Sequence, residues 1–283
     1  MNDPLYEQIT KLPLEYINAK LKDFLLEDSP HGDPTSNLTV GKSKITTAFL
    51  VGEDPAIFCG AQIIQALNKD FEVELLCSDG DPIVSNQKIA IIKGNARKLL
   101  KYERILLNLL QRLTGISTLT KKYTDIVKNS GIKILDTRKT TPGLRLFEKY
   151  AVTVGGGYNH RLNLSEGLLI KDNHWVASSD DFYKIIKENN HKYPIQVEVD
   201  RKDQLINLLE YEIDAILLDN MNPDYARDCV QTIRNINQKV FIEISGGVTI
   251  DNLKDYIIEG VDGISSGALM HQAQNKKIKL EFE

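Results

Sequence analysis

Basic side chains gather around two short apolar runs between residues 132 and 174. The runs cover residues 132–135 and 168–170. The basic residues that follow or separate them include Arg138, Lys139, His160, Arg161 and Lys171, with Thr137 beside the first pair. Short apolar runs predict buried strands, and strand ends are where α/β folds build their sites. In a chain with 39 acidic and 35 basic residues, such a concentration of cations predicts a polyanionic ligand.

Two serine- and glycine-containing turns follow later apolar runs. The first holds Ser245, Gly246 and Gly247, and the second holds Ser266, Gly267 and Ala268, where another helix is expected to begin. In α/β barrels the loops after the last two strands commonly bind phosphate, and glycine lets backbone N–H groups approach the oxygens. Both turns are also compatible with ordinary tight connections, but two in succession favour a phosphate site.

Two acidic residues lie on neighbouring predicted strands. Alternation along residues 195–200 places Glu198 on the face opposite Val197 and Val199, and Asp219 closes the apolar run 215–218. An unpaired carboxylate is costly in an apolar interface, so we expect Glu198 to point into the site. Mg²⁺ commonly takes one or two carboxylates plus substrate oxygens and water. Ion pairing with Lys139 or Lys171 is the alternative, and the two interpretations are compatible.

The bulk properties exclude several classes of protein. A net charge of −4 argues against a general nucleic-acid binder, and no apolar stretch approaches the ~20 residues that span a bilayer. The first residues lack the pattern of a signal peptide. Three widely spaced cysteines suggest neither a disulfide framework nor a zinc site, so a reduced cytoplasmic setting is expected.

The order of predicted elements indicates an α/β protein with two domains. Residues 1–114 mix an early amphipathic helix, strands at 44–51 and 88–92, a short helix at 60–68 and a long helix at 95–113, which is the pattern of an α/β sandwich. Residues 115–269 repeat strand and helix, which predicts a parallel barrel. Six strands are clear, a further one is possible at Val152–Val154, and the C-terminal residues 270–283 are expected to join the sandwich.

At this point the chain resembles the quinolinate phosphoribosyltransferase family, also called nicotinate-nucleotide pyrophosphorylase (carboxylating). The resemblance rests on the strings DTRKTTPGLR, EKYAV, GGGYNHR and LIKDNH, and on VEVD, LLDNM, EISGG and GISSGAL in the same order later in the chain. It implies an N-terminal α/β sandwich and an incomplete TIM-like barrel of about seven strands. The stretch Glu103–Thr118 is similar to the family's central helix. By spacing alone Arg104 belongs to a solvated polar stripe, but the resemblance implies that it reaches into the active site of a neighbouring subunit of a homodimer or a larger assembly of dimers.

The resemblance also implies the roles of the site residues. Quinolinate carries two adjacent carboxylates, which arginine holds bidentately and lysine holds poorly. Arg138, Arg161 and the partner's Arg104 are therefore expected to bind quinolinate with His160 nearby, and Thr137 to line the site. Lys139 and Lys171 suit 5-phosphoribosyl 1-pyrophosphate, Glu198 and Asp219 suit Mg²⁺, and the two serine-glycine turns suit the ribose 5-phosphate. Lys139, Lys171, Glu198 and Asp219 are the expected catalytic residues.

The reaction implied is that of a pentosyltransferase, a type II phosphoribosyltransferase of NAD biosynthesis. It converts quinolinate and 5-phosphoribosyl 1-pyrophosphate into nicotinate mononucleotide, pyrophosphate and CO₂, with Mg²⁺ and no organic cofactor. Three alternatives stay open: a ModD-type relative of uncertain substrate, an enzyme that uses nicotinate directly, and a non-catalytic barrel that binds phosphate metabolites. The C-terminal string GALMHQAQNKKIKLEFE departs from the family's usual pattern. His174 is either a site residue or structural.

Overall fold

The computed structural model describes residues 2–177 and 182–283, and the chain divides into two compact units. The barrel unit consists of Met1–Gln8, Thr120–Arg145 and Gly156–Gln272. The sandwich unit consists of Ile9–Leu119, Leu146–Gly155 and Ala273–Glu283. The last segment belongs to the sandwich unit because its strand pairs there, as described next.

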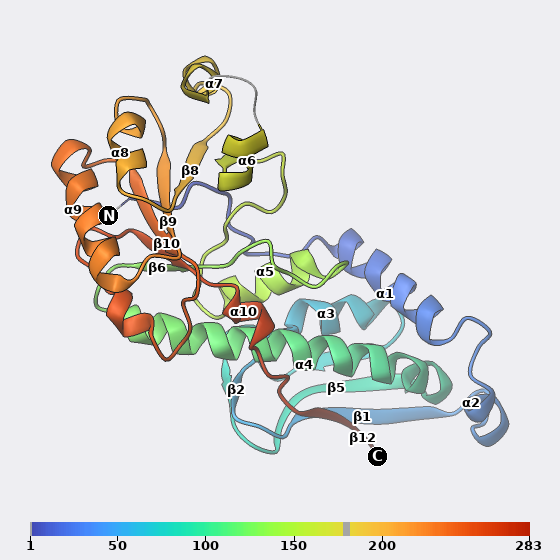
Figure 1. Cartoon of the computed structure of the whole chain (residues 1–283). Coiled ribbons are helices and arrows are strands. Elements are labelled where there is room, and N and C mark those ends of the chain that lie inside the picture. Colours follow the sequence, from blue (N-terminus) through green and yellow to red (C-terminus); the bar gives the residue numbers. More distant parts are fainter. Residues whose placement is uncertain (1, 178–181) are drawn as a thin grey trace. The chain divides into compact units, whose positions relative to one another are not determined.

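The sandwich unit contains a four-stranded antiparallel sheet in the order β12-β1-β5-β3. The strands are β1 (Ile45–Gly52), β3 (Glu72–Leu75), β5 (Gln87–Asn95) and β12 (Ile278–Phe282). β12 pairs with β1 although more than two hundred residues separate them in the chain (Figure 1). This unit also contains α1 (Leu14–Asp28), α2 (Pro34–Thr39), β2 (Ala56–Ile57), α3 (Ala61–Gln65), η1 (Ala66–Lys69) and β4 (Pro82–Ile83). The early amphipathic helix, the short helix and both long strands are thereby confirmed, with ends shifted by a few residues.

The long helix α4 (Ala96–Val127) extends well beyond its predicted end at residue 113. The expected boundary between residues 114 and 115 therefore lies inside a helix, and the two units meet along the chain at Leu119 and Thr120. Gly115, the first residue of the predicted barrel, lies within the helix. A Cβ at this position would lie 2.4 Å from the carbonyl oxygen of Gln274, so the helix has glycine where another backbone segment approaches it closely.

The barrel unit is built on a six-stranded parallel sheet in the order β6-β11-β10-β9-β8-β7. Its strands are β6 (Lys133–Leu135), β7 (Leu168–Ile170), β8 (Ile195–Val199), β9 (Ala215–Asp219), β10 (Phe241–Ser245) and β11 (Gly263–Ser265). All six predicted strands are confirmed. Residues of β8, β9 and β10 are almost continuously buried, as expected for parallel strands that are covered on both faces.

The possible seventh strand at Val152–Val154 is wrong. These residues end helix α5 (Arg145–Val154), in which Phe147, Tyr150 and Ala151 are buried at helical spacing. The next residues contribute one isolated bridge, Tyr158 to Leu135 on β6. The sheet therefore has six strands, and β6 and β7 are its two edges, so the barrel is incomplete as expected.

Short helices follow the parallel strands. They are α6 (Asp172–Ala177), α7 (Phe182–Asn189), α8 (Asp203–Leu208), α9 (Pro223–Ile236), η2 (Leu253–Tyr256) and α10 (Ala268–His271). The start of α9 follows from its sequence, because the Asn222 side chain accepts a hydrogen bond from the Tyr225 amide and Pro223 occupies the first turn. Among the described residues, all helices are too short or too polar to cross a bilayer. The three cysteines are free and buried.

Candidate active site

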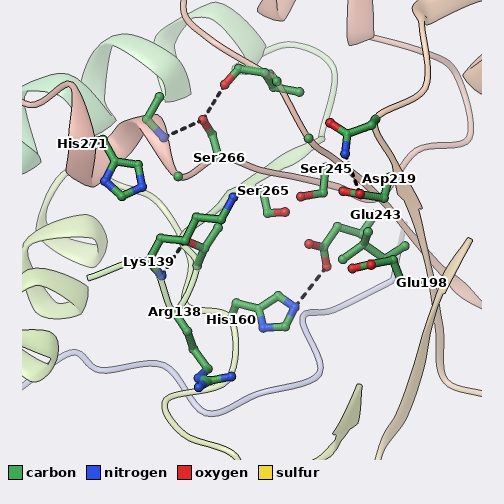
Figure 2. A pocket seen from close by; sticks show the side chains of 18 of the residues that line it. Arg138, Lys139, His160, Glu198, Asp219, Glu243, Ser245, Ser265, Ser266 and His271 are labelled. Atoms are coloured by element: carbon green, nitrogen blue, oxygen red, sulfur yellow. Dashed lines mark hydrogen bonds and ion pairs between the residues drawn. The ribbon is translucent and has the colours of Figure 1, made fainter. Parts of the chain in front are cut away.

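A cavity of about 560 Å³ opens at the carboxyl ends of the parallel strands. Every site residue predicted in the barrel lines it: Thr137, Arg138, Lys139, His160, Arg161, Lys171, Glu198, Asp219, Ser245, Gly246, Gly247, Ser266, Gly267 and Ala268. Figure 2 labels Arg138, Lys139, His160, Glu198, Asp219, Ser245 and Ser266 among them. Most of them come from the ends of six strands that are widely separated in the sequence, whereas His160 and Arg161 lie in the loop that precedes β7. The geometry thus brings the basic cluster, the acidic pair and both serine-glycine turns to one place.

The acidic side of the cavity contains a half-buried ion pair between Lys171 and Glu198. Burial raises the pKa of the Glu198 carboxyl, Lys171 lowers it, and the charge of Asp219 raises it again. Asp219 accepts a hydrogen bond of 2.7 Å from the side chain of Asn220. The ion-pair interpretation of Glu198 is therefore correct, and both carboxylates still line the cavity, as the metal interpretation requires.

The turn after β10 is locked to the end of β9. The backbone of Asn220 has a positive φ of 54°, and its N–H donates to the carbonyl of Ser245 at 3.0 Å. A Cβ on Gly246 would lie 2.4 Å from the Asn220 side-chain oxygen, whereas a Cβ on Gly247 would meet no heavy atom of the described residues within 4 Å. Gly246 therefore permits close packing, and Gly247 leaves open space.

A buried network holds the string GGGYNHR against DTRK. The carboxylate of Asp136, which is fully buried, accepts from the His160 amide at 2.8 Å and from the Asn159 side chain at 2.6 Å. The Arg161 amide donates to Nδ1 of His160 at 2.9 Å. An Nδ1 that accepts a hydrogen bond carries no proton, so this bond assigns the neutral Nε2–H form to His160. The sequence suggested a potential cation here, and the structure makes it a neutral donor.

The two arginines lie in the cavity with unsatisfied donors. Arg161 is only 5% exposed, and one of its terminal nitrogens donates to the carbonyl of Gly167 at 3.1 Å. The Nε atoms of Arg138 and Arg161 are buried and have no hydrogen-bond partner among the described residues. Burial lowers the pKa of Arg161, and the charge of Arg138 lowers it further. Arginine nevertheless stays protonated, so this part of the cavity holds buried positive charge that an anion would stabilise.

The turn after β11 is tied to the turn after β10 through Ser266. Its hydroxyl donates to the carbonyl of Val248 at 2.6 Å and accepts from the Ala268 amide at 3.2 Å. Gly267 faces Lys139 and His271, because a Cβ at this glycine would lie 3.0 Å and 3.4 Å from their side chains. Lys139 and His271 thus flank the serine-glycine turn (Figure 2).

Two residues from the sequence analysis lie elsewhere. Arg104 is exposed on α4 and is not among the described residues that line the cavity, which is compatible with its expected role in a neighbouring subunit. His174 is exposed, and its Nδ1 accepts from the Lys171 amide at 2.9 Å. Since the Lys171 carbonyl also accepts from the His174 amide, this histidine shapes the turn after β7.

Six polar residues that line the cavity were not predicted as site residues: Asn220, Glu243, Thr249, Ser265, His271 and Gln272. Glu243 was detectable, because it precedes Ser245 by two residues and therefore lies on the same strand face. The same alternation had identified Glu198. His271 lies four residues after Gly267, one helical turn further. Asn220 had no comparable signal, because its position depends on its left-handed backbone.

Family models match almost the whole chain. The quinolinate phosphoribosyl transferase N-terminal domain matches residues 33–114, and the C-terminal domain matches residues 116–281. The chain belongs to the quinolinate phosphoribosyltransferase family. The resemblance drawn from the sequence strings is thereby confirmed.

Known relatives of the family agree with this assignment. The probable nicotinate-nucleotide pyrophosphorylase (carboxylating) of Bacillus subtilis (strain 168) is 39% identical, covering 92% of this chain and 91% of the relative. The nicotinate-nucleotide pyrophosphorylase (carboxylating) of Mycobacterium leprae (strain TN) is 37% identical and covers 91% and 94%. The solved nicotinate-nucleotide pyrophosphorylase of Francisella tularensis superposes with a TM-score of 0.89 at 33% identity, covering 98% of this chain and all of that one.

Proposed function

We propose that this chain is a decarboxylating quinolinate phosphoribosyltransferase, a pentosyltransferase of NAD biosynthesis. The observation that carries the proposal is the pair of guanidinium groups, Arg138 and Arg161, whose buried Nε–H groups lack protein acceptors in the described ranges. A buried cation that lacks a partner is costly, and two of them suit a ligand with two adjacent carboxylates. The serine-glycine turns on the other side of the cavity suit a phosphate.

The cavity has two subsites, one for quinolinate and one for 5-phosphoribosyl 1-pyrophosphate. Arg138, Arg161 and the neutral His160 bind the quinolinate dicarboxylate, and Thr137 lines the same region. The turns 245–247 and 266–268 hold the 5-phosphate of 5-phosphoribosyl 1-pyrophosphate. Lys139 and Lys171 neutralise the pyrophosphate as it leaves, since the compact charge of a flexible ammonium group suits a phosphate. Lys171 already forms an ion pair with Glu198, which lies on the acidic side of the cavity.

In the first step the ring nitrogen of quinolinate uses its lone pair to bond to C1′ of the ribose. The C1′–oxygen bond breaks, and its electron pair leaves with pyrophosphate. The resulting pyridinium nitrogen withdraws electrons, so the bond from C2 to its carboxylate breaks, CO₂ departs, and C2 takes up a proton from water. Positioning and charge stabilisation supply most of the catalysis, because the barrier lies in separating pyrophosphate from the ribose.

Mg²⁺ fits the acidic side of the cavity. Glu198 and Asp219 would hold the ion partly through substrate oxygens and water, in line with its preference for few protein carboxylates. The described residues contain no group of three potential protein ligands, which fits an ion that arrives with its substrate. When bound, Mg²⁺ supplies positive charge next to the leaving pyrophosphate.

The subsite for quinolinate disfavours nicotinate as the direct substrate. Nicotinate has a single carboxylate, and one of the two guanidinium groups would stay unpaired. We further propose a homodimer, or a larger assembly of dimers, in which Arg104 enters the neighbouring subunit's cavity. The three free, buried cysteines are compatible with a reduced cytoplasmic setting.

The experiment is a turnover assay with quinolinate labelled in its 2-carboxylate. Purified protein with Mg²⁺ and 5-phosphoribosyl 1-pyrophosphate should release labelled CO₂ and pyrophosphate in equal amounts and form nicotinate mononucleotide. The variant Lys139→Ala serves as the control for background decarboxylation. A folded protein that releases no CO₂, or that turns over nicotinate faster than quinolinate, would exclude the proposal.

A further inference from the structure

The carboxyl group of Glu243 has an unusual environment on the cavity floor. Glu243 lies on β10 and is only 2% exposed, yet it lines the cavity. Its Oε2 accepts a hydrogen bond of 2.7 Å from the Gln196 side chain and lies 3.5 Å from Nε2 of His160. Its Oε1 is buried and receives no hydrogen bond from the described residues.

The charge of Glu243 is not matched by a neighbouring protein cation. Gln196 is neutral, and His160 is neutral because its Nδ1 accepts the Arg161 amide. Across residues 2–177 and 182–283, no Lys or Arg side chain forms an ion pair with Glu243. The basic side chain that lies within ion-pair distance of its carboxylate is that of His160. The negative charge of Glu243 also acts on Tyr6. The ring of Tyr6 lies 5.0 Å from that of His160. Burial raises the pKa of Tyr6, and the negative charge of Glu243 raises it further.

A buried carboxylate of this kind costs free energy unless something in the site compensates it. Quinolinate cannot do so in the ground state, because it is itself a dianion without hydrogen-bond donors at neutral pH. The compensating charge must therefore develop during the reaction or arrive with the other substrate.

The position of Glu243 indicates which charge this is. Strand register places Glu243 beside Leu217, and Leu217 beside Glu198, in one row across the floor of the cavity. Ser245, at the start of the phosphate turn, lies one layer above Glu243 on the same strand face. On its other side Glu243 approaches His160 of the quinolinate subsite (Figure 2). Glu243 thus lies where the two subsites meet, and there the ring nitrogen must reach C1′.

We infer that Glu243 is a further catalytic residue of this site, whose buried carboxylate stabilises the positive charge that develops on C1′ and then on the ring nitrogen. The inference rests on the proposed function. As the C1′–oxygen bond breaks, its electron pair leaves with pyrophosphate and C1′ becomes positive. The lone pair of the ring nitrogen then forms the new bond and the positive charge passes to the pyridinium. Glu243 is fixed in place before the reaction, so it needs no reorganisation to stabilise either charge.

This role has a signature that a structural role lacks. The carboxylate repels the quinolinate dianion before the reaction and attracts the cation during it. Removing its charge should therefore slow the chemical step without weakening the binding of quinolinate, or even while strengthening it.

The test compares Glu243→Gln, which keeps the shape of the side chain and removes its charge, with Glu259→Gln, which removes an exposed glutamate of the same unit. Quinolinate binding is measured by calorimetry, the chemical step by single-turnover CO₂ release, and folding by thermal unfolding. We expect Glu243→Gln to lower the single-turnover rate by about 10²- to 10³-fold, with a quinolinate Kd equal to or below that of the wild type. Glu259→Gln should behave as the wild type.

A rate within about threefold of the wild type, or a Kd that rises as much as the rate falls, would overturn the inference. If Glu243→Gln does not fold, the equal-sized pair Glu243→Asp and Glu243→Asn repeats the comparison, and the charged variant must be the faster one. If the wild type and Glu259→Gln both fail to turn over quinolinate, the result would instead overturn the proposed function.

Discussion

At the scale of single residues, the chemistry depends on groups that the fold leaves unsatisfied. Arg138, Arg161 and Glu243 each keep a buried polar atom without a hydrogen-bond partner in the described part of the chain. Most buried polar groups in proteins are paired, so three exceptions that line one cavity mark where ligand groups belong. Two are cationic and one is anionic, which matches a dianionic acceptor that becomes a cation during the reaction.

Replacing Arg161 by lysine should weaken quinolinate binding. Lysine keeps a charge but lacks the planar guanidinium that matches a carboxylate, so we expect a loss of about 1–3 kcal/mol, or ~10- to 100-fold in Kd. Calorimetric titration with quinolinate measures it. Titration with 5-phosphoribosyl 1-pyrophosphate provides the control and should change little. Equal losses for both ligands would place Arg161 outside the quinolinate subsite.

The raised pKa of Glu198 predicts an acid limb in the pH profile. Burial favours the protonated form, so the ionised carboxylate that pairs with Lys171 is lost at a higher pH than for an ordinary glutamate. The contribution of this carboxyl to the free energy of unfolding changes with pH in the opposite direction, since it decreases as the pH rises. The folded state binds this proton more tightly than the unfolded state, so that contribution is complete below the unfolded pKa and is lost as the pH rises through the folded pKa.

The variant Lys171→Met checks this assignment. It removes the charge that lowers the Glu198 pKa, so the carboxyl should titrate at a still higher pH. Carboxyl-labelled NMR measures the titration, with Glu198→Gln used to assign the signal. A titration that stays the same or moves to lower pH would contradict the ion pair as the cause.

At the scale of elements, the turn after β10 combines two glycines with different tasks. Both have positive φ, 87° at Gly246 and 65° at Gly247. Gly246→Ala should cost about 3 kcal/mol, because backbone strain adds to the overlap with Asn220. Gly247→Ala should cost about 1 kcal/mol from strain alone. Denaturant unfolding of both variants measures the difference, and equal losses would show that the Asn220 contact does not matter.

The same scale shows where sequence patterns succeed and fail. The six parallel strands were predictable because short, continuously apolar runs are typical of parallel strands that are buried on both faces. The run Val152–Val154 has the β-branched composition of a strand, yet it ends α5. Tertiary packing overrides its local preference, because residues Phe147, Tyr150 and Ala151 are buried at helical spacing. The end of α4 was missed since Gly115 serves a close backbone contact and does not stop the helix.

At the scale of the whole molecule, the proposed role of Arg104 makes the active site a property of an assembly. Arg104→Ala and Lys139→Ala should each be inactive, because one lacks the donated arginine and the other a lysine of its own cavity. After mixing and subunit exchange, about half of the dimers would pair one subunit of each kind and regain one intact site. We therefore expect up to about a quarter of wild-type activity.

Light scattering and activity measured before and after exchange provide the test. The control is a mixture of Lys139→Ala with Lys171→Ala, since both changes affect the subunit's own cavity and the pair should restore less. Dimers that exchange subunits and stay inactive would show that Arg104 acts elsewhere or not at all.

By itself the sequence determined the family, the α/β class, the six parallel strands and more than half of the residues that line the cavity. It did so because these features are local: an apolar run, a serine-glycine turn or a basic pair lies within a few neighbouring residues. The tertiary structure alone decided that His160 is neutral, that Gly246 is required by Asn220, and that Glu243 is buried in the cavity lining with one unsatisfied oxygen. The contact of Gly246 with Asn220 and the burial of Glu243 depend on neighbouring strands, and pairing across strands has no trace in the order of residues along a single strand. The form of His160 depends on how its ring is turned toward the amide of the next residue, and the order of residues does not specify that orientation.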